Sequence, residues 1–88
     1  MEAGKLYQYC NGSFDKFVTL SPNYRDQEIF RLKLGDVIMF LGVINRPNAY
    51  VEYHKVLCPN GLVGWINYRQ HEWDLGIPYS DWEHLQER

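Results

Sequence analysis

The chain has 88 residues, and its nine basic and eleven acidic side chains give a formal charge of −2. This length predicts a single domain, and an apolar fraction of 45% with 16% aromatic residues excludes a disordered chain. The basic residues are well separated, so nucleic acid is not the expected partner, because phosphate binding needs a concentrated positive face. No stretch approaches the roughly 18 apolar residues of a membrane span, and residues 1–10 lack the apolar run of a secretory leader. We therefore expect a cytoplasmic protein with no membrane contact, in which Cys10 and Cys58 are free thiols.

Short strands separated by turn pairs are predicted along most of the chain. The turns are Asn11-Gly12, Gly35-Asp36 and Asn60-Gly61. The predicted strands are brief and alternate in hydropathy or are rich in β-branched and aromatic residues, as expected of an all-β domain. Five of them cover residues 5–10, 16–20, 37–41, 49–58 and 62–67, and residues 72–75 can add a short sixth. Residues 29–34 form an extended segment whose alternate apolar residues share one face.

The strand predicted at residues 37–41 is apolar on both faces. Ile38 and Phe40 are expected to face the interior, which leaves Val37, Met39 and Leu41 in need of a second cover.

The C-terminal segment supplies one candidate cover. Ser80 and Glu83 form a capping box, which predicts a short helix that places Trp82 and Leu85 on one face. We expect this tail to dock on its own barrel, with homodimerisation through the same surface as the alternative.

Two motifs together resemble Src-homology-3 domains. The segment EIFRLKLGDVIMFLG is similar to the part of that family in which an acidic residue precedes alternating apolar positions and a Gly-Asp turn. The segment NGLVGWI is similar to its distal hairpin, with Gly61, Gly64, Trp65 and Ile66 at the motif positions. The resemblance covers roughly residues 5–75 and implies a five- to six-stranded barrel over residues 1–76. Residues 77–88 would form a tail of the same domain.

The resemblance also implies a partner-binding face made of aromatic rings. The residues predicted for it are Tyr7, Tyr9, Tyr50, Trp65 and Tyr68, and the alternative for each ring is packing inside the barrel. Peptide-binding members place two adjacent Trp at the start of the third strand and a Pro after the core residue that matches Ile66. This chain has Tyr50, Tyr53 and Asn67 at the corresponding places, so a proline-rich ligand is not the favoured one. Gly64 itself is expected where another backbone lies close.

Neither catalysis nor metal binding is predicted. The histidines (His54, His71 and His84) and the two cysteines lack the local pairs of zinc sites, so surface histidines and buried thiols are expected. No cofactor motif is present. The predicted function is a non-catalytic module that binds another protein, as an adaptor or small inhibitor of the kind that phages and mobile elements encode. The alternative is a small-molecule or nucleotide-binding protein with its site at an oligomer interface.

Overall fold

The regular structure of the protein is entirely β in the part that the computed structural model describes, which is residues 1–10, 16–47, 51–72, 77–80 and 85–88. The described strands are β1 (Leu6–Tyr9), β2 (Lys16–Thr19), β3 (Glu28–Leu32), β4 (Val37–Asn45), β5 (Val51–Leu57), β6 (Val63–Glu72), β7 (Ile77–Ser80) and β8 (Leu85–Glu87). Within these ranges no helix has the length and hydropathy needed to cross a membrane.

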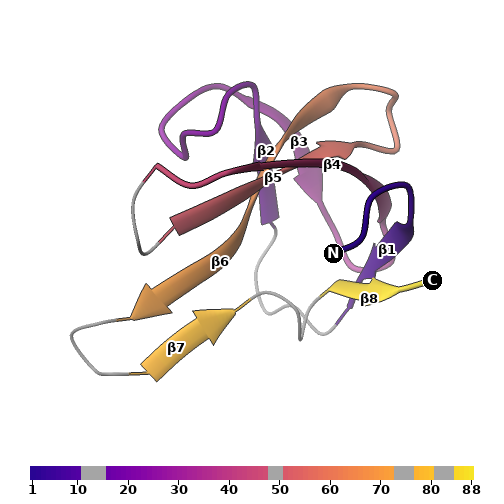
Figure 1. Ribbon diagram of the computed structural model, residues 1–88. Coiled ribbons are helices and arrows are strands. Elements are labelled where there is room, and N and C mark those ends of the chain that lie inside the picture. Colours follow the sequence, from indigo (N-terminus) through magenta and orange to yellow (C-terminus); the bar gives the residue numbers. More distant parts are fainter. Residues whose placement is uncertain (11–15, 48–50, 73–76, 81–84) are drawn as a thin grey trace.

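The strands form one antiparallel sheet in the order β3-β2-β6-β5-β4-β1-β8. Strand β6 is long enough to pair with β5 along one edge, and with β2 and then β7 along the other. The sheet curls into a half-barrel, and β8 lies beside β1 near the N-terminus (Figure 1). The prediction of a small all-β fold is therefore confirmed.

The core lies on the concave face of the curled sheet. Ile38 and Phe40 of β4 are buried there, as predicted, because alternate residues of a strand point to one face. The other buried apolar side chains of this cluster are Tyr7, Tyr9, Val18, Leu32, Val56, Cys58, Ile66 and Leu85. Each central strand thus contributes its inward-facing residues to a single interior.

Two of the predicted turns are described, and both depend on a glycine with positive φ. Gly35 has φ of +94° between β3 and β4, and Gly61 has φ of +84° between β5 and β6. In the second turn the N–H of Cys58 donates to the carbonyl of Leu62 at 2.8 Å, which closes the hairpin. The Asn11-Gly12 turn lies outside the described residues.

Gly64 lies where two strands and the core approach each other closely, as the sequence predicts. A Cβ at this position would stand 2.6 Å from both Ile29 Cδ1 and Val18 Cγ1, and 2.8 Å from the backbone oxygen of Thr19. Only glycine fits this contact between β6 and β2 without displacement of its neighbours.

The predicted C-terminal helix is wrong for the described part of the tail. Ile77–Ser80 forms β7 on β6, and Leu85–Glu87 forms β8 on β1. Leu85 pairs with Tyr9 and is buried in the core, so it does not cover the outer face of β4. The tail therefore docks on its own sheet, but as strands.

The outer face of β4 carries the three apolar residues that were predicted to be covered either by the tail or by a second copy of the chain. Val37, Met39 and Leu41 are half-buried there. Trp82, predicted to pack against them, lies outside the described residues, as do residues 73–75 of the predicted last strand.

Candidate binding site

A hollow of about 190 Å³ opens on the outer face of the sheet, where β2, β6 and β5 lie side by side. The pairing of these strands places the site residues opposite one another in two rows that run across the sheet. Trp65 of β6 stands between Thr19 of β2 and Lys55 of β5, and Asn67 stands beside Tyr53. The described residues that line the hollow are Lys16, Phe17, Thr19, Tyr24, Tyr53, Trp65 and Asn67.

The loop between β2 and β3 forms one wall of the site and is fixed by hydrogen bonds. The N–H of Tyr24 donates to the hydroxyl of Tyr53 at 2.9 Å, and the Thr19 hydroxyl donates to the carbonyl of Ser21 at 2.7 Å. The N–H of Leu20 also donates to the carbonyl of Gln27 at 2.9 Å, which closes the base of the loop. Under this loop Tyr53 is only 3% exposed, and its burial raises the pKa of its phenol. The wall is thus attached directly to the sheet.

Aromatic rings with large exposed areas surround the hollow. Phe17 is 52% exposed and Tyr24 is 66% exposed, while Trp65 is half-buried between its neighbours. Aromatic rings bury 150–250 Å² each when they are covered, so rings left in water represent a large unused contact area. This concentration of exposed rings marks the hollow as a surface that can hold a ligand.

Each of the three rings lies beside a cation. The Arg31 guanidinium carbon is 4.7 Å from the centroid of the Phe17 ring, and Phe17 and Arg31 are paired across β2 and β3. The corresponding distances are 5.4 Å from Arg25 to Tyr24 and 5.9 Å from the Lys55 Nζ to Trp65. These contacts lie within the range of cation–π attraction, so they hold positive charge at the rim of the site.

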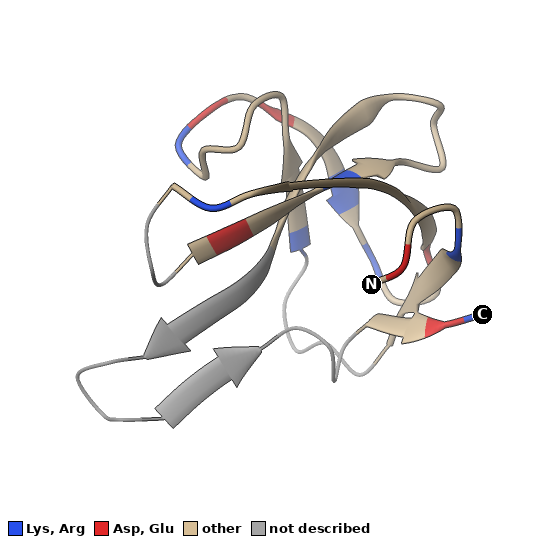
Figure 2. Ribbon diagram, in the orientation of Figure 1, with Lys and Arg blue, Asp and Glu red and all other residues tan. Residues whose placement is uncertain are grey.

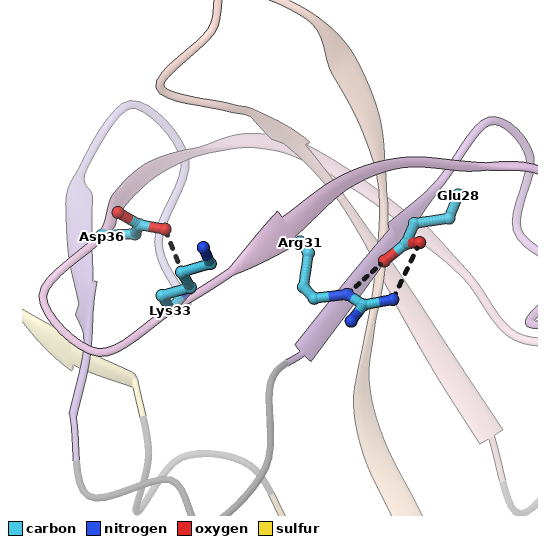
Figure 3. Close-up of polar contacts among 4 residues, drawn as sticks. All are labelled: Glu28, Arg31, Lys33 and Asp36. Atoms are coloured by element: carbon cyan, nitrogen blue, oxygen red, sulfur yellow. Dashed lines mark hydrogen bonds and ion pairs between the residues drawn. The ribbon is translucent and has the colours of Figure 1, made fainter.

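Arg31 is also held by a carboxylate. Its Nε and Nη2 donate to the two carboxylate oxygens of Glu28 at 2.9 and 3.3 Å (Figure 3). The hydrogen bond from Arg31 holds the pKa of Glu28 below its usual range. Figure 2 shows Lys and Arg positions, in blue, on both of the neighbouring strands β2 and β3.

The aromatic residues predicted to bind a partner do not all lie at this site. Trp65 lines it, but Tyr7 and Tyr9 are buried in the core on the opposite face of the sheet. Their inclusion in an exposed groove was therefore wrong, because rings that pack in the interior present no area to a partner. Tyr50 and the side chain of Tyr68 lie outside the described residues.

Three aromatic residues of the site were not predicted. Phe17, Tyr24 and Tyr53 line the hollow. Phe17 and Thr19 lie on the face of β2 opposite Val18, so alternation along the strand is the signal that could have placed Phe17 with the site. Nothing in the loop sequence shows that Tyr24 folds back onto Tyr53.

A buried polar cluster lies elsewhere, on β5. His54 is 2% exposed, its Nε2 is 3.0 Å from Glu52 Oε2, and its ring lies 4.8 Å from that of Phe40. Arg46 Nη2 is 2.6 Å from the other Glu52 oxygen. The expectation of a surface histidine is therefore wrong for His54, while His71 and His84 lie outside the described residues. Among the residues that the structure describes, no three His, Cys, Asp or Glu side chains are placed to hold a metal ion.

Both cysteines are free thiols, as predicted. Cys58 is buried, and burial raises the pKa of its thiol to about 11, while Cys10 is half-buried. A thiol with so high a pKa is a poor nucleophile at neutral pH.

No protein-family model, curated protein or solved structure matches this chain at a significant level.

Proposed function

We propose that this protein is a non-catalytic binding module that holds a segment of another protein in the outer-face hollow. The observation that carries this proposal is the gathering of the exposed Phe17 and Tyr24 rings and the half-buried Trp65 ring around one hollow. Tyrosine, tryptophan and phenylalanine are enriched in protein interfaces because they combine large apolar area with few rotatable bonds.

The size of the hollow favours a protein partner over a small molecule. Its volume is about 190 Å³, whereas sites for small molecules usually enclose about 300–1,000 Å³. A hollow of this size on an open sheet face accommodates one or two side chains of a larger partner. The alternative of a small-molecule or nucleotide site at an oligomer interface has no comparable observation in its favour.

The fold supports a divergent Src-homology-3-like barrel as the scaffold of this module. Gly64 occupies the close approach to β2, Ile66 is fully buried, and Trp65 between them faces the outer surface. This alternation is what the resemblance of NGLVGWI to the distal hairpin implies. Such a module, acting in the cytoplasm, suits an adaptor or an inhibitor of a larger protein.

Site-specific photo-crosslinking tests the proposal in cells that express the protein. We expect p-benzoylphenylalanine at position 17 or 24 to form adducts with one and the same partner. The same probe at position 34 is the matched control, because Leu34 is 64% exposed but does not line the hollow. Adducts at position 34 that equal those at positions 17 and 24, or partner capture that survives Tyr24→Ser and Phe17→Ser, would overturn the proposal.

A further inference from the structure

We infer that the segment bound in the hollow is acidic, with an aspartate or glutamate beside the apolar side chain that enters between the rings. This inference rests on the proposed function and adds the chemistry of the ligand. It is based on the positively charged side chains that the fold places around the hollow.

Basic residues that are far apart in the sequence meet at this site. Lys16 lines the hollow, and Arg25, Arg31 and Lys55 each contact one of its aromatic rings. These are four of the nine basic residues of a chain whose formal charge is −2. The positive rim is therefore a product of the fold and is not visible as a cluster in the sequence.

Two carboxylates near this rim, Glu28 and Asp26, are engaged within the protein, while Asp15, next to Lys16 in the sequence, lies outside the described residues. Glu28 accepts two hydrogen bonds from Arg31, and Asp26 accepts one from the N–H of Gln27 at 2.8 Å. A hydrogen bond with Ser21, and then that with Gln27, lower the pKa of Asp26. Of the described residues that line the hollow, Lys16 alone carries a charge. Because the ion pair of Arg31 with Glu28 is neutral overall, a carboxylate brought by a ligand would meet Arg25 and Lys55 at the rim.

Arg25 and Lys55 are placed to meet such a carboxylate. The Nε of Arg25 donates to the Tyr24 hydroxyl at 3.0 Å, which holds the guanidinium at the rim. A guanidinium binds a carboxylate through paired donors, while the Lys55 ammonium supplies a point charge beside Trp65. The aromatic rings of the hollow would receive the apolar part of the same segment.

The same observations favour an acidic peptide over a nucleic acid. Bases bind single-stranded nucleic-acid sites by stacking on open ring faces, whereas each of these three rings already has a cation within 4.7–5.9 Å of its centroid. A long polyanion would also meet the negative charge of the rest of the chain, whose isoelectric point is about 5.8. A short acidic segment requires only the local positive rim.

Selection from a displayed library of random dodecapeptides, with the full chain as bait, tests the inference. We expect the selected peptides to carry Asp or Glu next to an aromatic or aliphatic residue. Binding of a selected peptide, followed by fluorescence anisotropy, should weaken about tenfold in the double variant Arg25→Gln/Lys55→Gln. It should also weaken as salt rises. Lys33→Gln is the matched control, because Lys33 is an exposed cation at the β3–β4 turn that does not line the hollow, and it should leave the affinity unchanged.

The outcomes separate the inference from the proposed function. Peptides whose binding survives Phe17→Ser and Tyr24→Ser would bind elsewhere and would overturn the proposed function. Peptides that require Phe17 and Tyr24 but lack acidic residues, or that bind the Arg25→Gln/Lys55→Gln variant as tightly as the wild type, would overturn only the acidic ligand. Tighter binding of a fluorescein-labelled oligo(dT) than of every selected peptide, lost in the same variants, would replace the peptide with a nucleic acid.

Discussion

The backbone N–H of Tyr24 donates a hydrogen bond to the side-chain hydroxyl of Tyr53 across 2.9 Å. This bond joins the β2–β3 loop to β5, although the two residues are 29 positions apart in the chain. Tyr53 is almost fully covered as a result, while the Tyr24 ring beside it stays exposed. One phenol thus forms the floor of the binding site and holds its wall in place.

Substitution Tyr53→Phe should lower the free energy of unfolding by about 1 kcal/mol, because it removes one net hydrogen bond and leaves the Tyr24 N–H without its acceptor. Hydrogen exchange at the Tyr24 amide should accelerate, and urea melts measure the stability. Tyr24→Phe is the matched control, since it keeps the backbone donor and should change both quantities little. Unchanged amide exchange in Tyr53→Phe would show that the loop is held by other contacts.

Substitution Gly64→Ala should lower the free energy of unfolding by about 2–3 kcal/mol, because the added methyl group overlaps Val18, Ile29 and the Thr19 carbonyl. Gly61→Ala provides the comparison, since its Cβ meets nothing within 4 Å and its cost of about 1 kcal/mol arises only from the positive φ. Denaturant melts of both variants should rank Gly64→Ala as the less stable. The reverse order would mean that β6 and β2 separate more easily than the structure indicates.

Stability should fall as the pH falls below about 6.5, because burial, the largest cause, lowers the pKa of His54 below that value in the folded state. The hydrogen bond to Glu52 opposes this shift, while the N-terminal ammonium and Arg46 add to it. A histidine whose folded-state pKa is depressed binds protons more readily when unfolded. Its contribution is therefore complete above pH 6.5 and is lost as the pH decreases.

Titration of Glu52 also lowers the stability of the protein as the pH falls, but at a lower pH than titration of His54. Burial alone would raise its pKa, but hydrogen bonds with His54 and Arg46 outweigh this effect and hold the pKa below 4.5. Urea melts at a series of pH values measure how steeply stability falls with pH, and His54→Gln should reduce this dependence in the range just below pH 6.5. If the free energy of unfolding depends on pH identically in the wild type and in His54→Gln, the loss of stability arises from other titrating groups.

Substitution Leu85→Ala should lower the free energy of unfolding by about 3 kcal/mol, because Leu85 is 4% exposed and fills the core beside Tyr9. The neighbouring Gln86→Ala keeps β8 in place and removes only an exposed side chain, so it should change stability by less than about 0.5 kcal/mol. Thermal melts distinguish the two variants. Equal melting temperatures would show that β8 adds nothing to the core.

Alternation in the sequence predicted the strands better than it predicted their faces. It placed Ile38 and Phe40 inside correctly, because β4 is regular at these positions. In β5 the alternation over residues 49–58 groups Tyr53 with Val51 and Leu57 on one face and His54 with Glu52 on the other. The structure buries both, on opposite faces, next to a register shift at Glu52 and Tyr53. His54 is tolerated inside because it bonds to Glu52 and packs on Phe40, and Tyr53 is covered because a loop distant in sequence folds over it.

The tail and the candidate site show why local patterns were insufficient. The capping box at Ser80 and Glu83 is a valid helix signal, but a helix of two turns is marginal in water. The edge of β1 offers Leu85 a complete set of partners in the core, and this tertiary contact prevails over the local preference. The positive rim of the hollow depends in the same way on residues from β2, β3, β5 and the β2–β3 loop, which no single sequence window contains.

The pairing of Tyr9 with Leu85 also has a kinetic consequence. These partners are 76 positions apart (85 − 9), and both side chains belong to the same interior. A contact between such distant residues requires most of the chain to be ordered first, because closing a long loop costs conformational entropy before the contact stabilises anything. A nascent chain that has not yet reached residue 85 therefore exposes β1 as an open sheet edge with an unfilled apolar position, and it remains prone to association until that residue is added.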